Sequence, residues 1–250
     1  MSEAVVPSHF QTVFTSSSDR RLWFRWILAN ALGEIVGLGL AALVGVWFVL
    51  NNEKDQTATT IILTAILMIL AGTFEGAVVG FAQSFVLRSA IKDFKARGWI
   101  IATAIGAFIA WTLGGIPSVA MSLQEQTSGA TSPETNDAAM YGMAAVMGLA
   151  LGFTLAVPQW LVLRKYSTRA GWWTSANALA WTFGMPVIFI AASNAPPSNP
   201  FLLILWIGFV IGLAGTIVGA IHGLFLIWLL QRRSEGESLG HPLGFQKVKE

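Results

Sequence analysis

Two glutamates stand inside long apolar stretches of the sequence, and they are the residues most able to do chemistry. Glu34 lies in the stretch 22–50 and Glu75 in the stretch 61–87, and neither has a basic residue at the same depth. Ionisable groups in such positions are costly, so we treat both as functional candidates. If they share a site of low dielectric constant, at least one is expected to hold a proton. The pair could then carry a proton or bind a cation. The alternative is that each is neutral and bonded to a backbone carbonyl or to Asn30, or that one faces a water-filled vestibule.

A second set of candidates consists of one polar side chain in each of six apolar stretches. A rise of about 1.5 Å per helical residue places all six at nearly the same depth, and we call them the polar layer. We expect them to hydrogen-bond one another between helices, since unpaired amides are costly in lipid. Two alternatives remain open: a constriction that selects a permeating solute, and a site for a cofactor or a lipid headgroup. The residues are Asn30, Gln83, Thr103, Gln159, Asn177 and His222.

These polar residues belong to a pattern that occurs three times. The run Trp-x-x-Ala-Asn-Ala-Leu-Gly at Trp26 returns in similar form at Trp99 and Trp173, with spacings of 73 and 74 residues. Further along each copy, small residues occur four apart and are followed by Gln or His. Such a stripe lies on one helix face and lets another helix approach closely, although a glycine-lined pore is an alternative. The stripe glycines are Gly72, Gly76, Gly80, Gly148, Gly152, Gly215 and Gly219.

The copies differ at the residues that could act chemically. Glu34 stands where the other copies have Ala107 and Trp181, and Glu75 stands where they have Leu151 and Ala214. His222 stands where the other two copies have glutamine. These departures single out the two glutamates and the histidine for testing.

The composition requires a membrane to position these residues. The chain is 54% hydrophobic and 11% charged, against about 25% charged residues in soluble domains. Six stretches reach the length of about 20 residues that crosses a bilayer. We therefore predict an all-α integral membrane protein with three tandem parallel helical hairpins, which could surround a pseudo-threefold axis. The predicted spans are 22–50, 61–87, 99–123, 138–163, 172–193 and 201–230. They form hairpins 22–88, 99–164 and 171–231 between tails 1–21 and 232–250.

The distribution of positive charge predicts the orientation. Of the 15 Lys and Arg residues, all but Lys54 lie in the tails, in the first turn, or in the loops after the second and fourth spans. The positive-inside rule makes that side cytoplasmic, so both termini are expected there. We expect an inner, cytoplasmic membrane of a bacterium. Tryptophans near that side, among them Trp26, Trp99 and Trp173, are expected to form an interfacial belt.

Several function classes fit this sequence poorly. Only three histidines and no cysteines occur, and we find no nucleophile–histidine–acid set, so we expect no enzyme activity, no metal and no resident cofactor. The basic loops are what membrane insertion requires, so no nucleic-acid partner is expected. The expected partners are the lipid bilayer and a membrane protein or second copy.

The best functional prediction is a transporter or channel for a small solute, a proton or a cation that uses the buried carboxylates. The alternatives are a non-catalytic scaffold, assembly or signalling subunit, and a pigment- or lipid-binding membrane protein.

Overall fold

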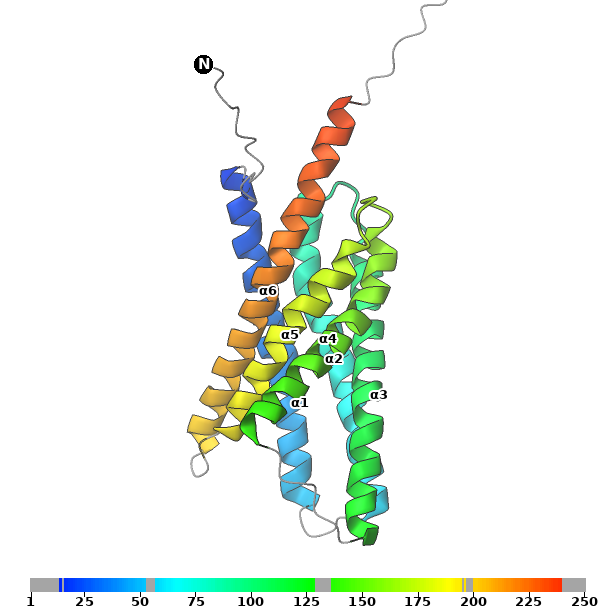
Figure 1. Cartoon of the computed structure of the whole chain (residues 1–250), viewed down its shortest axis with the longest axis vertical. Coiled ribbons are helices and arrows are strands. Elements are labelled where there is room, and N and C mark those ends of the chain that lie inside the picture. Colours follow the sequence, from blue (N-terminus) through cyan, green and yellow to red (C-terminus); the bar gives the residue numbers. More distant parts are fainter. Residues whose placement is uncertain are drawn as a thin grey trace, which may run out of the picture.

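Six long α-helices make up the described part of the computed structural model (Figure 1). That part covers residues 14, 16–52, 57–128, 136–194, 196 and 200–239, and the predicted tails 1–21 and 232–250 extend beyond it. Each predicted span lies within one helix, and the largest difference is at the last helix, which continues from the predicted end at Leu230 to Leu239. The helices are α1 (Ser17–Asn52), α2 (Ala58–Ala90), α3 (Ala96–Ser128), α4 (Asp137–Leu163), α5 (Trp172–Ser193) and α6 (Pro200–Leu239).

The surface of the helices confirms that the chain is a multi-pass membrane protein. All six are long and apolar enough to cross a membrane. Many of their large apolar side chains point outward, and Phe24, Phe81, Val146, Phe153 and Phe209 are each more than half exposed. A soluble monomer rarely shows so extensive an apolar surface, because water would disfavour it. Such an apolar surface is stable in contact with lipid.

The helices form a closed ring. Each helix packs against the next one in the sequence, and α6 packs against α1. The first residues of α1 and the last residues of α6 lie at the same end of the bundle (Figure 1). There the side-chain amide of Gln231 donates a hydrogen bond to Asp19 Oδ2 at 2.9 Å. We call this the terminal end, and we call the end where α1 finishes and α2 begins the opposite end.

Polar residues fix the starts of two helices at the opposite end. Thr57 precedes α2, and its hydroxyl oxygen accepts a hydrogen bond from the backbone N–H of Thr60 at 3.2 Å. Asn136 precedes α4, and its side-chain oxygen accepts from the backbone N–H of Ala139 at 2.8 Å. Both bonds satisfy backbone donors that a helix start leaves unpaired.

The stripe glycines set the close approach at three junctions of the ring: α2 with α3, α4 with α5, and α6 with α1. A Cβ atom added to Gly76 would lie 2.9 Å from the carbonyl oxygen of Thr103. One added to Gly152 would lie 2.9 Å from the Cα of Ala178, and one added to Gly215 would lie 3.0 Å from the Cα of Ala31. A larger side chain at any of these positions would push two backbones apart.

The tryptophans near the terminal end correct one expectation from the sequence. Trp26, Trp99 and Trp173 are 0% exposed, so they do not form an interfacial belt. Their rings pack against one another inside the bundle, with centroids 5.9 Å apart for Trp26 and Trp173 and 5.8 Å apart for Trp99 and Trp173. The belt prediction considered only depth. Each tryptophan stands four residues before a polar-layer residue, which puts both on the same, inward face of the helix.

Candidate functional site

All six residues of the polar layer line one small cavity inside the ring. This inner cavity has a volume of about 40 Å³, and residues from all six helices enclose it. Glu34 and Glu75 line it as well. Each of the eight side chains is at least nine-tenths buried. The structure thus brings the polar layer and the two carboxyl groups to one place.

Gln83 of α2 links the helices on both sides of it. Its Nε2 donates to Asn30 Oδ1 in α1 at 2.9 Å, and its Oε1 accepts from the indole N–H of Trp99 in α3 at 2.9 Å. Asn30 in turn donates to the backbone carbonyl of Trp26 at 2.8 Å. Both polar atoms of the Gln83 amide therefore have a partner on a neighbouring helix.

Gln159 of α4 makes the corresponding bonds one junction further on. Its Nε2 donates to Thr103 Oγ1 in α3 at 3.0 Å, and its Oε1 accepts from the indole N–H of Trp173 in α5 at 2.8 Å. The Thr103 hydroxyl donates to the carbonyl of Trp99 at 2.9 Å. The glutamines of α2 and α4 hold their neighbours by the same pair of contacts.

His222 of α6 does not complete the set. Neither of its ring nitrogens has a hydrogen-bond partner among the described residues, and the same is true of the indole N–H of Trp26 in α1. Its ring instead lies against Trp173, with centroids 5.2 Å apart. Asn177 of α5 donates to the carbonyl of Trp173 at 3.0 Å. The bonds that join helices through the polar layer are therefore found around α2 and α4, whereas those expected around α6 are not.

Glu34 and Glu75 face each other across the α1–α2 contact. They are 4% and 9% exposed, and both line the inner cavity. Two carboxylates in one buried site repel each other, and a proton on either of them removes that repulsion. Glu75 Oε2 also accepts from the indole N–H of Trp111 at 3.0 Å, whereas Glu34 Oε2 has no partner among the described residues. The pair is a built site that can hold a proton.

Two residues that place this pair were not predicted from the sequence. Gly37 lies three residues after Glu34, and a Cβ atom there would lie 2.9 Å from the Cα of Glu75. Its lack of a side chain lets α1 and α2 approach closely beside Glu34 and Glu75. Trp111, the donor to Glu75, is a deep tryptophan of α3. Gly37 lies on the same helix face as Glu34, and this spacing could have indicated a close helix contact beside Glu34. Nothing in the sequence indicates that Trp111 contacts Glu75.

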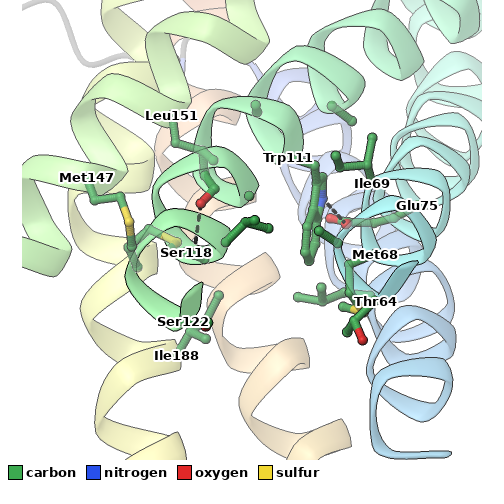
Figure 2. Close-up of a pocket in the computed structure, with 18 of the residues that line it drawn as sticks. Thr64, Met68, Ile69, Glu75, Trp111, Ser118, Ser122, Met147, Leu151 and Ile188 are labelled. Carbon is green, nitrogen blue, oxygen red and sulfur yellow. Dashed lines mark hydrogen bonds between the residues drawn. The ribbon is translucent and has the colours of Figure 1, made fainter. Parts of the chain in front are cut away.

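A larger cavity lies on the other side of the carboxyl pair. This outer cavity has a volume of about 630 Å³, is partly open to the surroundings and is lined by residues of α1 to α5 (Figure 2). It extends along α2 from Thr60 near the opposite end to Glu75, which corresponds to about 22 Å of helix. Glu75 lines both cavities. From the opposite end inward, the order is therefore the outer cavity, the carboxyl pair, the inner cavity and the buried tryptophans.

The stripe glycines mostly serve packing and do not line a pore. Of the seven, only Gly76 lines one of the two described cavities. The others contact side chains or backbone of the adjacent helix. Gly72 lies against the ring of Trp111, Gly80 against Thr103, Gly148 against Trp181, Gly152 against Asn177, Gly215 against Glu34 and Gly219 against Asn30.

The chemistry available at the site is that of two carboxyl groups, one imidazole and several amides. Within the described residues, no group of three or more His, Asp or Glu side chains could hold a metal ion. Comparisons of the chain with protein-family models, with curated proteins and with solved structures gave no significant match to any of them.

Proposed function

We propose that the protein is a small transporter or channel in which Glu34 and Glu75 carry a proton or a small cation. One observation carries this proposal: both carboxyl groups line the inner cavity, and Glu75 also lines the outer cavity. A group that is reached from both sides can take up an ion from one side and release it to the other. Intramembrane ionisable residues commonly mark such pathways.

The size of the inner cavity favours a proton or a small ion over a larger solute at this depth. A volume of about 40 Å³ exceeds the 10–15 Å³ or so that one water molecule needs, but it is far below the size of a metabolite. Glu34 Oε2 and both ring nitrogens of His222 have no partner among the described residues, and both side chains line this cavity. Buried polar atoms of this kind favour a small polar occupant, because leaving them unpaired is costly.

The proposed orientation follows from the positive charges. With the terminal end in the cytoplasm, as the positive-inside rule requires, the outer cavity opens to the other side of the membrane. The tryptophan cluster then closes the cytoplasmic side in this conformation. Passage therefore needs a rearrangement around Trp26, Trp99 and Trp173, which are fully buried here. We place the protein in the cytoplasmic membrane of a bacterium.

The proposed architecture is three hairpins in parallel orientation around a common axis. Close seams at the α2–α3, α4–α5 and α6–α1 junctions support it, as do the matching bonds of Gln83 and Gln159. In this arrangement the first hairpin supplies both glutamates, and the other two complete the enclosure around them.

The test is proton flux into liposomes that contain the purified protein. A potassium gradient with valinomycin sets the membrane potential, and a pH-sensitive dye inside the vesicles reports proton entry. We expect flux above that of empty liposomes, a loss of at least about tenfold in Glu75→Gln, and a clear decrease in Glu34→Gln, because an amide cannot release a proton. The matched control is Glu125→Gln, which removes an exposed carboxyl group of α3 outside both cavities. If the wild type shows no flux of protons or monovalent cations, or if neither variant differs from it, the proposal is wrong.

A further inference from the structure

The outer cavity has the size and the enclosure of a ligand-binding site. Its volume of about 630 Å³ lies within the range of about 300–1,000 Å³ that is usual for sites of small molecules. Most of its lining is apolar and includes Met68, Ile69, Met147 and Ile188 (Figure 2). A proton or an inorganic ion needs no such chamber. The lining therefore favours an organic molecule with substantial apolar surface.

The polar groups of the cavity determine the charge that such a molecule should carry. Among the described residues that line the cavity, Glu75 is the only one with an ionisable side chain. Trp111 stands beside it and points its N–H at the carboxylate, so this donor is already engaged (Figure 2). The six-membered and five-membered rings of the indole remain able to contact a cation. An anion would find a carboxylate at this position and no positive group.

The hydroxyl groups of the lining reinforce the same preference. Thr64 donates its hydroxyl proton to the carbonyl of Thr60 at 2.8 Å, and Ser118 donates to the carbonyl of Gly114 at 2.9 Å. With their protons used within their own helices, these oxygens offer lone pairs, so they can accept from N–H groups. Carboxylate, indole face and hydroxyl oxygens are all suited to a positively charged ligand.

We propose that the outer cavity binds an apolar monovalent organic cation, such as a protonated lipophilic amine, with its charge at Glu75. This proposal deepens the function proposed above, on which it rests for the exchange step. One cation enters and one proton leaves the carboxyl pair, so the net charge of the site does not change. The step starts with a proton on each carboxyl group, and after the proton of Glu75 leaves, the proton of Glu34 stays in place. A protein of this kind would exchange organic cations for protons across the membrane.

The test is the binding of tetraphenylphosphonium to the purified protein in detergent, measured by equilibrium dialysis and by calorimetry. We expect one cation per chain, release of up to one proton per cation in weak buffer, and a loss of affinity of at least about tenfold in Glu75→Gln. Tetraphenylborate, which has the same shape and the opposite charge, should not bind when it is dialysed against the protein in a separate experiment. Binding in detergent requires no flux, so cation binding without proton flux, measured both with a membrane potential alone and with a gradient of an organic cation, would reject the transport proposal alone. Proton flux without cation binding would reject only the present one.

A pair of glycine variants locates the site independently of charge. Gly114 lines the outer cavity and has no neighbouring atom within 4 Å of a Cβ atom, so Gly114→Trp should place an indole ring at the cavity and reduce its volume. Gly142 has equally open surroundings but does not line the cavity, and Gly142→Trp is the control. We expect the first variant to lose binding and the second to keep it. The proposal is overturned if Glu75→Gln or Gly114→Trp binds the cation as well as the wild type does. It is also overturned if a phospholipid copurifies with the protein and the cation does not displace it.

Discussion

Replacing His222 by glutamine is expected to make the protein more stable, because the variant can form the bonds that Gln83 and Gln159 form. In the variant, the new side-chain oxygen would accept from the indole N–H of Trp26, and the new amide would donate to Asn177 in α5. Trp26 corresponds to Trp99 and Trp173, which donate to the other two glutamines. Asn177 corresponds to Asn30 and Thr103, which accept from those glutamines. The side chain at position 222 of α6 would then be hydrogen-bonded to both neighbouring helices, α5 and α1.

The magnitude follows from three buried atoms of the wild type that have no partner in the part of the chain that the structure describes: the indole nitrogen of Trp26 and both ring nitrogens of His222. Each costs about 1 kcal/mol at the lower end of the range for unpaired buried groups. The contact of the His222 ring with Trp173 is lost, and an aromatic contact contributes about 1 kcal/mol. The net gain is about 2 kcal/mol. For a chain of this size, we expect a rise in melting temperature of about 4–8 °C.

The assay is thermal unfolding of the purified protein in detergent, followed by circular dichroism at one heating rate. Gln159→His is the matched control, since it removes the two corresponding bonds of Gln159 to Thr103 and Trp173 and should lower the melting temperature by a similar amount. If His222→Gln is no more stable than the wild type while Gln159→His is less stable, His222 is already well satisfied and the account of the α6–α1 junction is wrong.

Further substitutions test the seams and the tryptophan contacts. Gly152→Val should prevent stable folding or lower the melting temperature by more than about 5 °C. The reason is that even a Cβ atom at this position would lie 2.9 Å from the Cα of Ala178. Gly142→Val is the control and should have no such effect, because no atom lies within 4 Å of a Cβ atom there. Trp99→Phe should lower the free energy of unfolding by about 1–3 kcal/mol, since it leaves Gln83 Oε1 without its donor, and an unfolding titration that shows no change would contradict the hydrogen-bond assignment.

Depth and periodicity allowed most of the fold to be predicted, and the reasons are physical. A span must be long and apolar, so Leu22 to Leu50 and the five other stretches could be located from composition alone. Residues three or four apart share a helix face, so the small-residue stripes and the polar layer could be recognised as faces that contact other helices. The spans were confirmed by the six helices.

Contacts between distant helices were less accessible to this reasoning. Sequence spacing gives the depth of Trp111 but not its rotation toward Glu75, which depends on how α2 and α3 pack. For the same reason the interfacial belt was wrong for Trp26, Trp99 and Trp173, whose depth suits an interface but whose helix face points inward. The outer cavity could not be predicted at all, because it depends on the angles between helices and no pattern in one helix encodes those.

The contact between α6 and α1 has a consequence for biosynthesis. Glu34 and Asn30 lie against Gly215 and Gly219 of α6, which the ribosome makes after the other five described helices. Until α6 enters the membrane, one side of the first helix has no neighbour there, and its polar groups face lipid or a helper protein. The site therefore cannot be complete when its two glutamates have been inserted. It becomes complete only when the final helix closes the ring, so a chain truncated before residue 200 would hold both carboxyl groups and still lack their enclosure.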